Sequence, residues 1–285
     1  MSLEAHALAL IGAVCSAAAT VFIRQGLRGS NAYVGFWINV AVGTVIVWGA
    51  VFLFVPWDAF RLQALPFFIL SGLIGTVMGR LWRFVSIDKV GASVAAAIIN
   101  LSPFISTGLA IALLGEQVTV PILLGTLVIV LGTTLLSLSG RYVGFRARHL
   151  IYPLLSATCF GVVAIIRKLG LSQTVPLFGF AVNTTTALIA FTVFLFLSGK
   201  QHTLHCQWRN LGHFIAAGLA ENCGVLLILV ALSLGQVSVV TPLSGTAPLF
   251  VLPMTFFFLK GVETLSWRVV LGAGLIVLGV GLLTA

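Results

Sequence analysis

The chain is divided by short polar breaks into apolar stretches of about 20 residues, the length a helix needs to cross the hydrocarbon core of a bilayer. This spacing limits the possible folds more than any other feature of the sequence. The breaks define ten stretches, approximately residues 5–25, 32–55, 64–85, 91–114, 119–139, 149–169, 175–198, 209–232, 237–259 and 266–284. We therefore predict an all-α membrane protein with ten transmembrane helices.

The composition supports a lipid environment. Of the 285 residues, 60% are hydrophobic and 7% are charged, whereas soluble domains average about 45–50% apolar and about 25% charged residues. The four cysteines form no CxxC pair, so the sequence predicts neither a metal site nor a disulfide framework, and no cofactor. The first stretch lacks a basic start and a small-residue cleavage site, so we expect it to be retained.

Basic residues predict how the chain is oriented in the membrane. Ten spans place both termini on one face, and of the 15 Lys and Arg residues only Arg61, Arg167 and Lys168 fall on that face. Cytoplasmic loops carry the excess of Lys and Arg, which predicts that the termini lie outside the cytoplasm. The same rule accounts for the positive net charge without a nucleic-acid partner. We expect Arg167 and Lys168, at a predicted helix end, to snorkel towards lipid headgroups.

The sequence also contains an internal repeat. A shift of 147 residues aligns Glu116 with Glu263 and the "IVLG" of residues 129–132 with that of residues 276–279. Nearer the start of each half, a shift of 144 residues aligns "GFWIN" with "GFAVN". Two domains of five spans follow, residues 1–140 and 141–285. Since five is odd, the two halves must cross the membrane in opposite directions, which is an inverted-topology repeat typical of secondary transporters.

These motifs resemble the EamA family of the drug/metabolite transporter superfamily. In that family each half has a proline-broken fourth helix, a Gly-Glu turn and a glycine-spaced fifth helix. Pro103, Gly115 and Glu116 match in the first half; Pro248 and Glu263 match in the second, although Val262 replaces the glycine of the turn. The resemblance covers nearly the whole chain, and it is greatest to bacterial amino-acid exporters of the YddG type.

The resemblance implies a ten-helix basket around a central cavity, lined mainly by the first, third, fourth, sixth, eighth and ninth spans. The resemblance implies that members export amino acids and other metabolites, or exchange sugar-phosphates and nucleotide sugars in organelles. It implies a transporter of the cell inner membrane and not an enzyme. A monomer in the lipid bilayer is expected, with a small-molecule substrate as its partner.

Glu221 is the most unusual residue of the apolar stretches. It lies about 18 Å inside the eighth span at the helical rise, and the repeat aligns it with Ile74, so the symmetry of the fold does not require it. Placing a carboxylate in hydrocarbon is costly unless it faces a partner or a cavity. Two interpretations stay open: an ion pair, for which Arg80 is the best partner, or contact with a substrate ammonium or a transported proton.

The fourth and ninth spans are broken by prolines at matching positions of the two halves, which is the best sequence indicator of a transporter binding site. Each proline removes a helical hydrogen bond and frees a carbonyl. A plain packing kink is the alternative. The residues that we predict to act as hinges or gates are Pro103, Pro242 and Pro248. The residues that we predict to contact substrate are Met78, Trp82, Asn100, Ser102, Glu221, Thr241, Ser244 and Thr246.

Three further predictions concern polar or aromatic residues. Trp82 is either an interfacial anchor or a cation–π surface for an ammonium. Asn39 and Asn183, matched across the repeat, are expected to hydrogen-bond neighbouring helices. Glu116 and Glu263 are expected to cap the helix that follows each of them.

Together these features predict a secondary transporter that exports amino acids or related small metabolites by alternating access. No phosphate-binding GxxxxGK[ST] motif is present, so ATP hydrolysis is not the expected energy source. The alternatives are a proton-coupled exporter of cationic drugs, in which Glu221 exchanges the proton, and a flippase or membrane enzyme acting on polyprenyl-phosphate lipids.

Overall fold

The computed structural model describes residues 3–27, 30–90, 92–137, 146–200, 204–258 and 267–284, and these residues contain helices and turns but no β-strand. The α-helices are α1 Leu3–Gly26, α2 Ala32–Phe54, α3 Leu65–Ser71, α4 Arg80–Val90, α5 Ala92–Ile99, α6 Ser102–Leu114, α7 Val120–Ser137, α8 Ile151–Leu171, α9 Pro176–Leu197, α10 Trp208–Leu234, α11 Val237–Ser244, α12 Ala247–Phe258 and α13 Trp267–Thr284. The π-helix η3, Gly72–Gly79, connects α3 to α4, and three short 3₁₀ turns are η1 Trp57–Ala59, η2 Leu62–Ala64 and η4 Ala147–Leu150.

Eight helical stretches among the described residues are long and apolar enough to cross a membrane. Two shorter apolar helices, Val237–Val251 and Val270–Thr284, coincide with the last two predicted spans. The prediction of an all-helical, multi-pass membrane protein is therefore confirmed.

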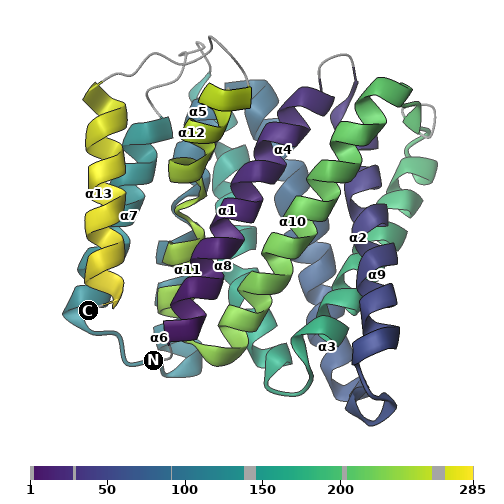
Figure 1. The fold of residues 1–285 in the computed structure, drawn as a ribbon, viewed down its shortest axis with the longest axis horizontal. Helices are drawn as coiled ribbons and strands as arrows, with labels where there is room; N and C mark the ends of the chain where they lie inside the picture. The colour runs from purple at the N-terminus through teal and green to yellow at the C-terminus, as the bar shows by residue number, and fades with distance from the viewer. Residues whose placement is uncertain are drawn as a thin grey trace.

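The helices stand side by side in one bundle (Figure 1). Helices α7 and α13 pack together at one edge, α1 packs along α10 near the middle, and α2 packs against α9 at the other edge. Figure 1 also shows both chain ends at the same end of the bundle. An even number of membrane crossings requires this placement.

The predicted breaks at prolines are present. Helix α5 ends at Ile99 and α6 begins at Ser102, with Pro103 in its first turn. Helix α11 ends at Ser244, α12 begins at Ala247, and Pro248 lies in the first turn of α12. Each break leaves two residues between helices, where backbone groups are released from the helical hydrogen-bond pattern.

The third apolar stretch is interrupted differently, by the eight-residue π-helix η3. The sequence predicted a regular span here. Gly72, at the start of η3, lies so close to α9 that a Cβ atom would be 2.8 Å from the backbone oxygen of Asn183. Short π segments are frequent at functional sites, and this one ends directly before Arg80.

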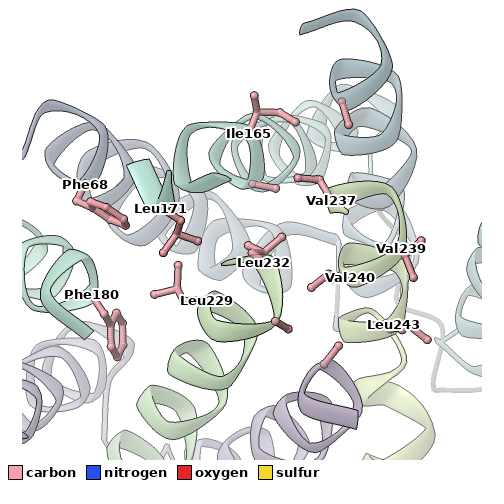
Figure 2. Packing of buried hydrophobic residues seen from close by; sticks show 14 of the residues in the cluster. Phe68, Ile165, Leu171, Phe180, Leu229, Leu232, Val237, Val239, Val240 and Leu243 are labelled. Atoms are coloured by element: carbon pink, nitrogen blue, oxygen red, sulfur yellow. The ribbon is translucent and has the colours of Figure 1, made fainter. Parts of the chain in front are cut away.

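The apolar core holds together the helices that surround the candidate site (Figure 2). Phe68 of α3 and Leu171 of α8 lie in the same cluster as Phe180 of α9, Leu229 of α10 and Val240 of α11. All five side chains are buried. In lipid the gain from such contacts is mostly van der Waals packing, which requires close fit.

Helices α7 and α13 approach through glycines. A Cβ atom on Gly125 would lie 2.9 Å from the backbone oxygen of Gly279, and one on Gly132 would lie 2.7 Å from that of Gly272. The reverse contacts, from Gly279 to Gly125 and from Gly272 to Gly132, are 2.8 and 2.9 Å. Glycine is needed at these positions because the two backbones nearly touch.

Glu116 caps a helix, but not the one that follows it. Its carboxylate accepts hydrogen bonds from the backbone N–H groups of Val237 (2.8 Å) and Ser238 (3.0 Å) and from the Ser238 hydroxyl (2.6 Å). These groups form the N-terminus of α11, 121 residues further along the chain. The prediction of a local cap was wrong because chain folding brings a more distant set of free N–H groups to the carboxylate. Glu263, its repeat partner, lies outside the described residues.

Candidate functional site

A cavity of about 210 Å³ lies where the two broken helices approach each other. It is bounded by the α5–α6 break and α6, by α11 and its break, and by α8 and α10. The lining residues are Asn100, Ser102, Pro103, Ser106, Phe160, Val163, Ala164, Arg167, Ile228, Leu232, Thr241, Ser244 and Gly245. Such a chamber, largely apolar with a few converging polar groups, has the general character of a small-molecule site.

Five residues predicted as substrate contacts or hinges line this cavity. Asn100, Ser102 and Pro103 come from the first broken helix, and Thr241 and Ser244 come from the second. The structure thus brings the two breaks together across about 140 residues of intervening chain, as expected for matching elements of two repeats.

Hydroxyl groups join the two broken helices. The Ser106 and Thr241 hydroxyl oxygens are 2.8 Å apart, and Thr241 also donates to the backbone oxygen of Val237 at 2.7 Å. Ser244 donates to the backbone oxygen of Thr241 at 2.8 Å. The protons of these hydroxyls are used within the protein, so the groups chiefly offer lone pairs to the cavity.

Arg167 of α8 also lines the cavity, although it was not among the residues predicted to contact substrate. Its Nε donates to the Ser71 hydroxyl at 2.9 Å. Lys168 is not among the lining residues. Its Nζ donates to the backbone oxygens of Leu232 and Gly235, at 2.7 and 2.6 Å. The prediction that both residues snorkel to headgroups was wrong, because each has polar partners inside the bundle that a headgroup would have to replace.

Glu221 does not line this cavity. It lies on α10 and forms an ion pair with Arg80, whose Nη2 is 3.1 Å from Glu221 Oε1. Asn39 of α2 bridges the pair, donating to Glu221 at 3.0 Å and accepting from Arg80 at 3.3 Å. The prediction that Arg80 is the partner of Glu221 is confirmed.

Asn183 of α9 forms a second bridge, to α3 and η3. Its Nδ2 donates to the Ser71 hydroxyl at 2.8 Å and its Oδ1 accepts from Thr76 at 3.1 Å. The prediction that Asn39 and Asn183 connect helices is confirmed. Through Ser71, the Asn183 bridge also reaches Arg167, so the polar interior of α3, η3 and α9 is continuous with the cavity wall.

The remaining predicted site residues lie outside the cavity lining. Met78 is half exposed, and Trp82 stacks on Tyr152 with ring centroids 5.6 Å apart. Thr246 is fully buried and donates to the backbone oxygen of Leu243. Pro242 is buried within α11, and Pro248 begins α12.

Helical spacing in the sequence could have indicated the cavity-lining residues that were not predicted. Ser106 lies one turn after Ser102, and Phe160, Val163, Ala164 and Arg167 follow one another at the three- and four-residue spacing of a single helix face. Adjacent residues such as Arg167 and Lys168 point about 100° apart around the helix, so they can meet different partners. The sequence did not show which face of α8 turns inward.

No described group of three or more His, Cys, Asp and Glu side chains is placed to hold a metal ion. The four cysteines, all described, are free.

A family model described as "EamA-like transporter family" matches residues 3–138 and again residues 148–285. The chain belongs to the EamA-like transporter family. Membership of the EamA-like family makes the chain a multi-pass membrane transporter of small molecules and implies that it is not an enzyme.

Similar proteins include one relative by sequence and one solved structure. An uncharacterized protein of Methanocaldococcus jannaschii is 31% identical over 135 residues, which are 47% of this chain and 95% of the relative. A crystal structure of another protein superposes with a TM-score of 0.83 at 14% identity, covering 99% of this chain and 96% of the other. At that identity the likeness shows the fold alone.

Proposed function

We propose that this chain is a secondary transporter of the cell inner membrane that exports amino acids or related small metabolites by alternating access. The observation that carries the proposal is the cavity itself, which lies between the two proline-broken helices and is lined by polar groups from both. Broken helices that line a cavity away from lipid are the usual construction of a transporter binding site.

The proposal includes ten spans in two inverted halves, residues 1–140 and 141–285. Three observations support it: the family model matches twice, the archaeal relative is about as long as one half, and α7 meets α13 reciprocally. Gly125 is the repeat equivalent of Gly272, yet it contacts Gly279, while Gly132 contacts Gly272. Such exchanged contacts are what a two-fold axis between equivalent helices produces.

In this mechanism the halves rock against each other around the cavity, and Pro103, Pro242 and Pro248 act as hinges. At the breaks before Pro103 and Pro248 the regular helical pattern is interrupted and few backbone hydrogen bonds cross, so a change in angle there disrupts fewer bonds than in a continuous helix. Met78, Trp82, Thr246 and Glu221 are proposed to contact substrate only in a conformation other than this one.

The cavity volume favours a small solute. The volume of about 210 Å³ is of the same order as the roughly 150 Å³ of a protein cavity that binds benzene. A free amino acid or a similar metabolite is of this size, whereas a polyprenyl-phosphate lipid is much larger.

Counterflow into liposomes tests the proposal. Purified protein is reconstituted into liposomes loaded with an unlabelled L-amino acid, and uptake of the labelled form is followed with and without a pH gradient. We expect uptake above that of protein-free liposomes for part of the amino-acid panel. Absence of counterflow for every amino acid, together with flux of a lipophilic cation, would contradict it.

That second result would favour the cationic-drug exporter, for which the depth of Glu221 is the supporting observation. The ion pair between Glu221 and Arg80 opposes it, because the carboxylate is already neutralised. A Glu221→Gln variant distinguishes the amino-acid exporter from the drug exporter. The variant must lose proton-coupled flux if Glu221 exchanges the proton, as in the drug exporter, but not in the amino-acid exporter.

A further inference from the structure

We propose that Arg167 and Asn100 form a carboxylate anchor inside the cavity, so that the solutes carried are those with a free carboxylate group. The proposal rests on the proposed function, since it names the chemistry of the substrate of that same cavity.

The guanidinium of Arg167 has donors available. Its described hydrogen bond uses Nε alone, and Ser71 accepts it at 2.9 Å. None of the described carboxylates lies within ion-pair distance of Arg167; the ion pair among the described residues is Arg80 with Glu221. A guanidinium has five N–H donors in a planar fork that matches the two oxygens of a carboxylate.

Ser71 and Asn183 restrict the orientation of this fork. Ser71, fully buried, receives one hydrogen bond from Arg167 and another from Asn183 at 2.8 Å. Both lone pairs of the Ser71 oxygen are therefore occupied. An arginine held in this way loses little further conformational entropy when a ligand binds, so its hydrogen bonds contribute more to affinity.

Asn100 supplies a second, independent observation. It lines the same cavity from the α5–α6 break, and its Nδ2 is buried without a hydrogen-bond partner. A buried donor without a partner is destabilising and uncommon in native structures. A ligand oxygen in the cavity would satisfy it.

The charge of the cavity lining also favours a carboxylate ligand. Arg167 is the cationic residue of the lining, and no acidic residue is among the lining residues. A cation in such surroundings costs several kcal/mol unless an anion joins it. The carboxylate of Glu221 does not serve as this anion, because it already forms an ion pair with Arg80. A substrate carboxylate is the group that completes the site.

The hydroxyls that α11 contributes to the lining suit the other end of an amino acid. Ser244 directs its proton to the Thr241 backbone, and Thr241 directs its own to Val237. Their oxygens can therefore accept hydrogen bonds from a substrate ammonium. The cavity lining thus combines donors from α8 and the α5–α6 break with acceptors from α11, the two kinds of group that a zwitterion requires.

Binding to the purified full-length protein tests the anchor without transport. Calorimetric titration compares each L-amino acid of a panel with its amide, which lacks the carboxylate, and with its deaminated acid, which lacks the ammonium. We expect amino acids and deaminated acids to bind and amides to bind at least about tenfold more weakly, the loss expected when a charge-assisted pair is removed. A panel in which no carboxylate-bearing member binds better than its amide overturns the proposal.

Variants assign the effect to the two residues. Arg167→Gln should weaken carboxylate binding about tenfold or more, and Asn100→Ala should weaken it severalfold. Arg167→Lys keeps the charge but not the fork and should fall between wild type and Arg167→Gln, which keeps the test decisive if Arg167→Gln misfolds. The control is Arg61→Gln, which removes the same charge from an exposed position outside the cavity. Equal carboxylate affinity in wild type and Arg167→Lys or Arg167→Gln overturns the proposal.

Failure of the anchor and failure of the proposed function give different results. Counterflow of amino acids and their amides at equal rates, unchanged by Arg167→Gln, overturns the anchor and leaves the transporter intact. Carboxylate-selective, Arg167-dependent binding without counterflow supports the anchor and contradicts the transport proposal.

Discussion

At the scale of single residues, the ion pair between Glu221 and Arg80 places two charges inside an apolar bundle. The two side chains are only 14% and 13% exposed. Asn39 satisfies a further lone pair of Glu221 and a further donor of Arg80. Buried pairs of this kind are destabilising when one partner is lost, because the other charge stays buried alone.

We therefore expect Glu221→Gln and Arg80→Gln each to lower the free energy of unfolding by about 3 kcal/mol, and the double variant to lower it by less than the sum. Denaturation in detergent, followed by tryptophan fluorescence, measures this. Glu4→Gln is the control because Glu4 is exposed in the first turn of α1. Additive losses would show that the pair contributes no coupling.

At the scale of elements, the turn between α10 and α11 is held from two sides. Lys168 of α8 donates to one carbonyl in the last turn of α10 and to that of Gly235, the residue after α10, and Glu116 accepts from the first N–H groups of α11. Each charge has the sign that the helix dipole at that end favours. The turn is thus fixed by residues from both halves.

Glu116→Ala should destabilise this turn by about 1 kcal/mol, the usual cost of losing an N-terminal cap. Faster hydrogen exchange at the amides of Val237 and Ser238 would report it. Glu116→Gln, which keeps an acceptor oxygen, should show a smaller increase. Unchanged exchange in Glu116→Ala would mean that the cap does not stabilise α11.

The contact between α7 and α13 permits a matched comparison on one helix. Gly279→Val places side-chain atoms against the Gly125 backbone, whereas a Cβ on Gly274 meets no atom within 4 Å. We expect Gly279→Val to lower stability by about 1–3 kcal/mol through overpacking and Gly274→Val to have little effect. Thermal unfolding monitored by size-exclusion chromatography compares them, and equal losses would argue against close α7–α13 contact.

At the scale of the whole molecule, the distribution of basic residues predicts termini outside the cytoplasm. Alkaline phosphatase fused after Ala285 should be active and green fluorescent protein fused there should be dark, since each reporter matures on one side of the membrane. Fusions after Gly199, at the end of α9 that faces the opposite side in a ten-span topology, serve as the control and should give the reverse pattern. The opposite result at both positions would invert the orientation.

The sequence by itself determined the helices, the membrane environment and the repeat, because each depends on local composition and spacing. About 20 apolar residues suffice to predict a spanning helix, and Pro103 and Pro248 suffice to predict where two of them break. The pairing of Glu221 with Arg80 was also predictable, since few charges lie at that depth.

Apart from the pair of Glu221 with Arg80, tertiary structure decided which polar residues meet. Arg167 and Lys168 are neighbours in sequence, yet one lines the cavity and the other holds the α10–α11 turn. Glu116 caps α11, not the helix that follows it. In a bilayer a buried polar group must find a partner wherever the packed helices bring one. That partner depends on helix rotation and packing, which apolar spacing does not encode.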